Sequence, residues 1–192
     1  MLLSDYDIDK LHKDCENLIL PWNDDNLQPA SYDLTLGEDL CIPHYAIIDP
    51  KFRKAENTGT YHVKLVDDHE AYLKFSGTTD VYPLRAHDFV LGTTQERIHI
   101  PNGIGARFEG KSSLGRIGLM THVTAGFIDP GFYGNITVEI CNINNDSIIN
   151  LRRGMKIGQI CFYEMKSKSM HPYGTRNNHY QNQSGATEAF KS

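Results

Sequence analysis

The sequence has no run of about 20 apolar residues, so it offers no candidate for a membrane-spanning helix. Residues 1–10 alternate apolar and acidic side chains and do not have the apolar core of a signal peptide. A basic excess is also missing. The formal net charge is −5, which disfavours a general nucleic-acid binder. These absences predict a cytoplasmic protein with no membrane partner and no nucleic-acid partner.

Cysteine is scarce, and its spacing is wide. Cys15, Cys41, Cys141 and Cys161 form no C-x-x-C pair, which is the spacing typical of zinc sites, and they suggest no disulfide framework. Buried thiols that pack as small apolar side chains are the preferred interpretation. We therefore predict a chain with no zinc and no disulfide.

The composition is that of a folded globular chain. Of the 192 residues, 40% are hydrophobic and 22% are charged, which argues against disorder. A chain of this length buries enough surface for a substantial core. There is no internal repeat and no linker, so we expect one domain over residues 1–192.

Most of the chain carries the signals of short strands. Ser4 is a good cap for a short helix in which Ile8, Leu11 and Cys15 share one face. After this helix, β-rich segments alternate with turn residues. The expected strands are residues 32–36, 61–66, 71–75, 88–94, 95–100, 136–143 and 157–165. Many short strands with few helical periods predict a mainly β fold, as a barrel or jelly-roll.

Residues 166–192 differ in composition from the rest. They are polar, rich in Asn, Gln, Ser and Gly, and show little apolar periodicity. Such a terminus is commonly disordered. However, it carries Tyr173, Tyr180 and Phe190, and a tail with aromatic side chains can fold over a ligand. The residues alone leave both interpretations open.

One segment imitates a phosphate-binding loop. Gly105 to Ser112 formally matches the pattern G-x-x-x-x-G-K-[ST]. A true loop of this kind needs a strand before it, a growing helix after it and a parallel sheet. Here Gly115 and Gly118 stand where the helix should grow, and the chain shows no βαβ pattern. We therefore reject a nucleotide-binding P-loop and, with it, an ATP-dependent kinase.

The same segment still has chemistry suited to phosphate. Lys111, Ser112, Ser113 and Arg116 supply two cations and two hydroxyls within six residues. Such groups, together with exposed main-chain N–H groups, bind triphosphate oxygens. A solvated polar turn is the commoner explanation for an isolated hexapeptide of this kind.

Two acidic residues stand in apolar surroundings. Residues 136–142 alternate with period two, and Glu139 is the lone acid among them. It is either part of an exposed sheet face or a partly desolvated general acid and base. Asp129 follows an apolar pair and precedes Pro-Gly, so it either forms a turn or stands at the rim of a pocket. Spacing alone does not decide between these alternatives.

Several segments, taken in chain order, point to one family. They are Gln28-Pro-Ala-Ser-Tyr-Asp-Leu-Thr-Leu-Gly37, Gly110-Lys-Ser-Ser-Leu-Gly-Arg116, His122-Val-Thr-Ala-Gly-Phe-Ile-Asp-Pro-Gly131, Ile136-Thr-Val-Glu139, Gly154-Met-Lys-Ile-Gly-Gln-Ile-Cys161, His171-Pro-Tyr-Gly174 and Tyr180-Gln-Asn-Gln183. Together they resemble the dCTP deaminase branch of the dUTPase-like superfamily. The resemblance covers nearly the whole chain.

The resemblance implies a fold, an assembly and a set of roles. It implies a homotrimer of distorted β-barrel or jelly-roll subunits of the β-clip type, with sites between subunits for dCTP or dUTP and Mg²⁺ accompanying the triphosphate. Glu139 would activate water for attack on C4 of cytosine and pass the proton to the leaving ammonia, and Ser112 and Arg116 would order the site. The implied substrate contacts are Lys111, Ser113, Leu114, Gly115, Thr137, Val138, Gln159, Tyr173, His179 and Gln183. Residues 166–192 would close over the site.

A carboxylate mechanism agrees with the missing zinc pattern. Zinc-dependent deaminases use a metal hydroxide and carry H-x-E with P-C-x-x-C, and this sequence has neither motif. A carboxylate placed on a strand would therefore have to act without zinc, from a well-fixed position.

Two further positions bear on the product. Gly126 and Phe127 resemble the bifunctional, dUMP-forming group, whereas the monofunctional type typically has His-Arg there. Asp129 would then position a water for attack on the α-phosphate, and the dUMP released would supply thymidylate synthesis. His179 departs from the Lys common in the family, which would weaken the tail's phosphate contacts or make them depend on pH.

Three alternatives keep the same fold. The first is a monofunctional dCTP deaminase that releases dUTP, and the second is a dUTPase without deaminase activity. The third is a trimeric binding module that has lost catalysis. Glu139, together with the intact Ser112 and Arg116, favours the deaminase over the last two.

Overall fold

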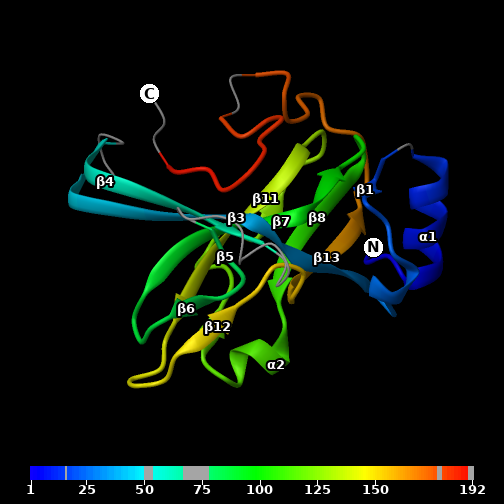
Figure 1. The fold of residues 1–192 in the computed structure, drawn as a ribbon. Coiled ribbons are helices and arrows are strands. Elements are labelled where there is room, and N and C mark those ends of the chain that lie inside the picture. Colours follow the sequence, from blue (N-terminus) through cyan, green and yellow to red (C-terminus); the bar gives the residue numbers. More distant parts are fainter. Residues whose placement is uncertain (16, 50–53, 67–77, 177–178, 190–192) are drawn as a thin grey trace.

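The computed structural model describes residues 1–15, 17–49, 54–66, 78–176 and 179–189 (Figure 1). Within these ranges the chain is mainly β, as the sequence predicts. The helices are α1 (Asp5–Asp14), the 3₁₀ turn η1 (Asp24–Asn26) and the short α2 (Ser112–Gly115). The strands are β1 (Ile19–Leu20), β2 (Leu27–Gln28), β3 (Ser31–Asp49), β4 (Lys54–Leu65), β5 (Thr78–Thr79), β6 (Tyr82–Leu84), β7 (Phe89–His99), β8 (Ile104–Gly110), β9 (Leu119–Met120), β10 (Phe127–Ile128), β11 (Tyr133–Asn142), β12 (Ile149–Leu151) and β13 (Lys156–Glu164).

One large sheet curls into a partly closed barrel (Figure 1). Its strand order is β10-β8-β13-β3-β7-β11-β9, and β4 pairs with the far half of β3. The neighbours along this path are antiparallel, whereas β4 and β5 are parallel. β3 makes the curl, because its first half pairs with β13 and its second half with β7 and β4. A small second sheet joins β12 to β6.

The core lies inside this curl. Period-two alternation buries one face of each central strand, as in β11, where Ile136, Val138 and Ile140 are at most 8% exposed. The N-terminal helix forms as predicted. The Ser4 side chain accepts a hydrogen bond from the Asp7 main chain in a capping box, and Ile8 is buried. No helix in the described residues is long and apolar enough to cross a membrane.

Several sequence predictions need correction. Residues 88–94 and 95–100 belong to one continuous strand, β7, because no turn residue separates Thr94 from Gln95. β3 does not end at Gly37. It continues well past this residue, and its register with β7 shifts there. A Cβ at Gly37 would lie 2.8 Å from the Thr93 side chain, so glycine serves close packing there. The expected strand 71–75 lies outside the described residues.

The cysteines also differ in part from expectation. None forms a disulfide, as predicted, but only Cys41 is buried, while Cys15, Cys141 and Cys161 are half-exposed. The segment that imitates a P-loop does open a helix at Ser112. This helix ends after one turn at Gly115, and β8 before it has antiparallel neighbours. The rejection of a P-loop therefore holds.

Candidate active site

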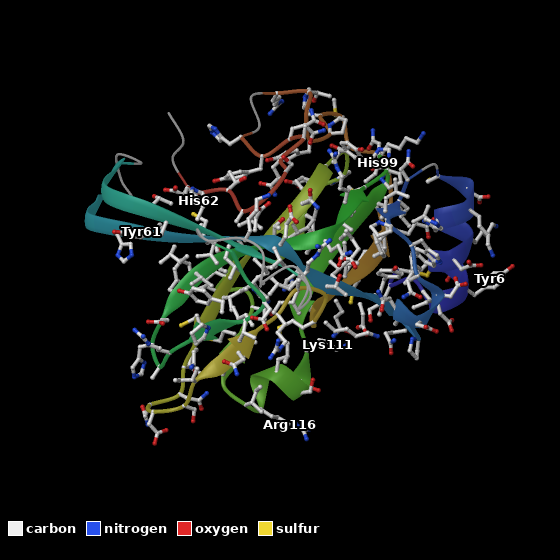
Figure 2. All side chains as sticks on the ribbon, viewed as in Figure 1. Tyr6, Tyr61, His62, His99, Lys111 and Arg116 are labelled. Carbon is white, nitrogen blue, oxygen red and sulfur yellow. The ribbon has the colours of Figure 1, made fainter. Side chains whose placement is uncertain are left out.

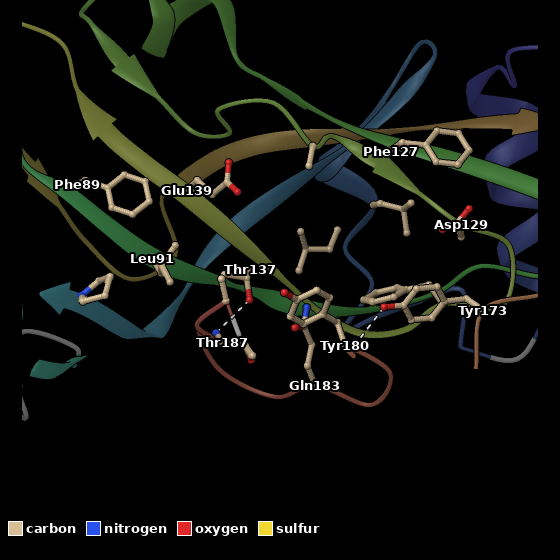
Figure 3. Close-up of a pocket in the computed structure, with 16 residues that line it drawn as sticks. Phe89, Leu91, Phe127, Asp129, Thr137, Glu139, Tyr173, Tyr180, Gln183 and Thr187 are labelled. Carbon is tan, nitrogen blue, oxygen red and sulfur yellow. Dashed lines mark hydrogen bonds between the residues drawn. The ribbon is translucent and has the colours of Figure 1, made fainter. Parts of the chain in front are cut away.

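A pocket of about 570 Å³ lies between β10, β11, β7 and the C-terminal tail (Figure 3). Its walls are mostly apolar, and a few polar groups converge on it, which is the usual character of a small-molecule site. The lining residues are Pro43, Phe89, Leu91, Ala125, Phe127, Ile128, Asp129, Phe132, Ile136, Thr137, Glu139, Tyr173, Tyr180, Gln183, Thr187 and Ala189.

Glu139 is held on the wall of this pocket by β11. It lies on the half-exposed face of the alternating strand, opposite Leu91 of β7. The main-chain N–H of Val123 donates to Glu139 Oε2 at 2.8 Å. This hydrogen bond fixes the carboxylate, and no hydrogen bond from a described residue reaches Oε1. One oxygen is thus held and the other is available for a water or ligand.

Asp129 stands at the rim of the same pocket, directly after β10. The chain turns at Gly131, whose φ of +90° favours glycine. A Cβ at Gly131 would also lie 2.7 Å from the Tyr173 carbonyl oxygen, so the turn makes room for the tail. The Tyr173 N–H donates to the Pro130 carbonyl at 2.7 Å. Asp129 is therefore both a turn residue and a pocket residue, and the two interpretations are compatible.

The tail is docked along β11 and is described without helix or strand. Gln183 Nε2 donates to the Asn135 carbonyl at 2.6 Å, and Asn182 N–H donates to the Tyr133 carbonyl at 2.8 Å. Thr187 N–H donates to Thr137 Oγ1 at 3.2 Å (Figure 3). These bonds bring Tyr173, Tyr180 and Gln183 into the pocket. Burial raises the pKa of the Tyr173 phenol, so this hydroxyl stays protonated at neutral pH.

Gln183 also has an atom in need of a partner. Its Oε1 is buried and has no hydrogen-bond partner among the described residues, while its Nε2 is committed to Asn135. The amide therefore keeps an unmet acceptor beside the pocket. Its expected phosphate contact therefore stays a prediction.

The expected phosphate segment lies elsewhere on the chain. Figure 1 shows α2 at the opposite end of the molecule from the tail, and Figure 2 labels Lys111 and Arg116 on that side. Ser112, Ser113, Gly115 and Arg116 are exposed. No residue from 111 to 116 lines the pocket. One copy of the chain thus does not bring the segment and Glu139 together in one cavity.

A buried carboxylate anchors the start of this segment. Asp33 is 2% exposed, and Lys111 Nζ and Lys156 Nζ contact its two oxygens at 2.5 and 3.0 Å. Two cations beside a buried anion offset the cost of its desolvation. Gln159 lies nearby on β13, where it accepts from Ser31 Oγ at 2.8 Å and donates to the Gly110 carbonyl at 3.4 Å. Lys111 is therefore held by Asp33 at the base of the α2 turn.

The predicted residues thus fall into separate places. Glu139, Asp129, Thr137, Tyr173, Gln183 and Phe127 line the pocket, whereas Lys111, Ser112, Ser113, Leu114, Gly115, Arg116, Val138, Gln159, His179 and Gly126 do not. Val138 is 1% exposed, so its side chain belongs to the core and only its main chain is available to a ligand. These positions alone do not decide the catalytic role of any of these residues or its contact with a substrate.

Gly126 has a packing role that the sequence did not reveal. Its carbonyl accepts from Phe108 N–H at 2.7 Å, and a Cβ there would lie 2.6 Å from the Phe108 carbonyl oxygen. Glycine is thus needed for the close approach of this segment to β8. Phe127 next to it is 61% exposed and edges the pocket.

Sequence reasoning missed the partners of the site. Asp33 lies within one of the recognised motifs, but nothing in the sequence showed that it would hold Lys111. Val123 acts through its main chain, which no residue pattern reveals. Phe89, Leu91 and Thr187 reach the pocket only because β7 and the tail pack beside β11.

Comparison with known proteins shows which family the chain resembles. A family model described as dCTP deaminase-like matches residues 2–165. The chain is 43% identical to the "dCTP deaminase, dUMP-forming" of Bifidobacterium animalis subsp. lactis, over 97% of this chain and 92% of the relative. It is 42% identical to the protein of the same description from Beutenbergia cavernae, over 97% of this chain and 93% of the relative.

A solved structure shares the fold. The 2'-deoxycytidine 5'-triphosphate deaminase from Agrobacterium tumefaciens superposes with a TM-score of 0.61 at 22% identity, over 84% of this chain and 47% of that chain. The curled β architecture is therefore one that a solved protein also adopts. Since the family model covers residues 2–165 and relatives above 40% identity match along nearly the whole length, this chain belongs to the dCTP deaminase-like family.

Proposed function

We propose that this protein deaminates dCTP at C4 of cytosine and then hydrolyses the triphosphate to dUMP and pyrophosphate. The observation that carries the proposal is Glu139, a carboxylate fixed by the Val123 N–H on the wall of an apolar pocket. Membership in the dCTP deaminase-like family supports the reaction, and the relatives described as dUMP-forming support the product. dCTP is a cytoplasmic metabolite, so we assign the enzyme to the cytoplasm.

In the deamination step, Glu139 carries the proton. The carboxylate takes a proton from water as the water oxygen forms a bond to C4. That proton passes to the exocyclic amino group, while the electron pair of the C4=N3 double bond moves to N3. The C4–N bond to the amino group then breaks and ammonia leaves, and the C4–OH group becomes a carbonyl as its proton ends on N3, which gives uracil. The Val123 N–H holds one carboxylate oxygen throughout, so the other one handles the proton. The apolar walls limit bulk water, which strengthens the electrostatic effect of the carboxylate.

The second step, hydrolysis of the triphosphate, involves another carboxylate, Asp129. We propose that it positions a water for attack on the α-phosphorus, after which pyrophosphate leaves. Mg²⁺ would enter with the triphosphate, where it would neutralise charge on the phosphate oxygens. The pocket fits such an ion, because Mg²⁺ is usually held by one or two carboxylates together with phosphates, and Asp129 is a hard oxygen donor in the lining.

A trimer with shared sites accounts for the separation of the predicted residues. Arg116 and Ser112 stand away from Glu139 in one copy (Figures 1 and 2), so a neighbouring copy would supply them to the pocket. Large apolar side chains stand exposed near these segments, including Ile117 at 52%, Val123 at 49% and Phe127 at 61%. Exposed apolar groups of this size commonly mark an interface.

The direct test is to incubate the protein with dCTP and Mg²⁺ and to separate the products by chromatography. The proposal expects dUMP and pyrophosphate without accumulation of dUTP. Accumulation of dUTP would indicate a monofunctional deaminase. Unchanged dCTP with turnover of added dUTP would instead favour the dUTPase alternative.

The two steps are separable by substitution. Asp129→Asn removes the negative charge at the rim and leaves Glu139 in place, so pyrophosphate release should fall by about 10²-fold or more while ammonia release falls much less. The measurement compares ammonia and pyrophosphate from the same reaction. Equal loss of both products would make Asp129 a structural or shared residue instead.

A further inference from the structure

Three residues with metal-ligating side chains meet where the β3–β4 ribbon faces residue 188 of the tail. Among the described residues, Cys41, His62 and Glu188 each place a ligand atom within 4.8 Å of the other two. Cys41 comes from β3, His62 from β4, and Glu188 from the tail. Figure 2 shows His62 on β4 beside the tail. The three come from parts of the sequence too far apart for a motif search to reveal them, and the sequence prediction of no zinc depended on the missing C-x-x-C spacing alone.

Strand pairing fixes two of these ligands. Cys41 and His62 are directly opposite in the antiparallel β3–β4 ladder, so their side chains share one face of the sheet. The tail brings the third, and Cys41 Sγ lies 3.8 Å from Glu188 Oε1. Ligand atoms on a tetrahedral zinc ion lie roughly 3.5 Å apart, given Zn–S and Zn–O bonds of about 2.3 and 2.0 Å. Small side-chain rotations would bring the group to that spacing.

The donor set selects the kind of ion. A thiolate and an imidazole favour zinc and other borderline or soft transition metals, whereas Mg²⁺ and Ca²⁺ prefer sites made of oxygen. Cys41 is buried and Glu188 half-buried, while His62 is exposed. The protein would thus cover one side of the ion and leave an entry path and a water position at His62.

The position of the group relates it to the pocket. Cys41 is the partner of Leu91 on β7, and Leu91 is the partner of Glu139 on β11. His62, Cys41, Leu91 and Glu139 therefore form one row across four adjacent strands. The neighbours of Glu188 in the tail, Thr187 and Ala189, line the pocket. An ion bound to Glu188 would tie the end of the tail to the sheet next to the pocket.

We infer that Cys41, His62 and Glu188 form a zinc site that clamps the C-terminal tail to the β3–β4 ribbon. Binding converts the Cys41 thiol to a thiolate and releases one proton. The ion takes no part in the deamination proposed above. It orders the tail, and this inference therefore stands or falls without the nucleotide chemistry.

The test is a Co²⁺ titration of chelator-treated protein, followed by competition with Zn²⁺. One Co²⁺ should bind per chain and give the thiolate-to-cobalt charge-transfer band with intense visible bands of tetrahedral coordination. His62→Gln and Glu188→Gln should each weaken binding at least tenfold. Cys161→Ser and His44→Gln are matched controls outside the group and should bind as the unaltered protein does.

Several outcomes would overturn the site. They are no Co²⁺ binding, a spectrum without the charge-transfer band, or equal affinity in the unaltered protein and in both variants. Cys41→Ala should abolish the band. If this substitution of a buried residue prevents folding, the variants at the exposed His62 and at Glu188 of the tail decide whether the site exists.

Proteolysis tests the clamp separately. Trypsin should cut the tail at Lys166, Lys168 and Arg176 at least tenfold more slowly when Zn²⁺ is present, and Glu188→Gln should abolish that protection. Cleavage that is equally fast with and without Zn²⁺ in the unaltered protein would overturn the clamping role. No nucleotide enters either measurement, so a failure here is distinct from a failure of the deaminase proposal.

Discussion

Glu139 shows how neighbouring residues fix the position of one carboxylate. The strand aims it at the pocket and the Val123 N–H holds one oxygen. Glu139→Gln keeps an acceptor for this N–H but loses the proton acceptor, so ammonia release should fall by about 10²–10⁴-fold while dCTP binding persists. Calorimetric binding and an ammonia assay measure the two effects. Glu164→Gln, at an exposed position where β13 ends, is a matched control. Undiminished ammonia release by Glu139→Gln would contradict the assignment.

Glu96 is a buried carboxylate whose effect is on stability. It is 3% exposed and accepts hydrogen bonds from Thr35 N–H at 2.9 Å and Thr35 Oγ1 at 2.8 Å. Burial raises the pKa of Glu96, and the hydrogen bonds from Thr35 only partly oppose the rise. The folded state therefore favours the protonated form more than the unfolded state does.

The sign of the pH dependence follows from this raised pKa. The stabilising contribution of Glu96 is complete below the pKa of the unfolded chain and is lost as the pH rises through the folded pKa. Relative to Glu96→Gln, the free energy of unfolding of the unaltered protein should therefore fall as the pH rises above the ordinary pKa of a glutamate, about 4.3. Urea denaturation of both proteins at a series of pH values measures this fall. Parallel curves would contradict the prediction.

At the scale of elements, the tail is held by hydrogen bonds to the segment around β11. Gln181 makes two of them, accepting from Tyr133 N–H at 3.2 Å and donating to the Gly131 carbonyl at 3.1 Å, without lining the pocket. Gln181→Ala removes both bonds, together worth roughly 1–3 kcal/mol. KM for dCTP should rise about tenfold with a smaller change in kcat, because the tail docks less often.

Steady-state kinetics of Gln181→Ala checks this prediction. Thr175→Ala is the matched control, because its hydroxyl bonds within the tail, to the Pro172 carbonyl. An unchanged KM in Gln181→Ala would mean that docking of the tail does not contribute to substrate binding.

At the scale of the whole molecule, the proposed trimer with shared sites predicts complementation. Glu139→Gln and Arg116→Ala should each be inactive alone, because every site lacks one group. Unfolding and refolding the two together should form mixed trimers in which about a quarter of the sites carry both native residues. Ammonia release by the mixture, against each variant refolded alone, measures the recovery. No recovery from well-folded mixed trimers would place Arg116 and Glu139 in the same subunit's site.

The amino-acid sequence by itself determined the class of the protein. Period-two alternation predicted β11 and placed Glu139 on the face opposite Ile136, Val138 and Ile140, and Ser4 predicted the start of α1. These features depend on local propensity and side-chain periodicity, which one segment carries alone. The ordered motifs also identified the family that the comparisons confirm.

Only the tertiary structure decided which distant residues meet. It joined Asp33 to Lys111, Val123 to Glu139, and the tail to β11. It also made β7 one strand where two were expected and gave Gly126 its packing role. Such contacts arise from strand register and close approach between segments far apart in the chain, and neither quantity is written in local residue patterns.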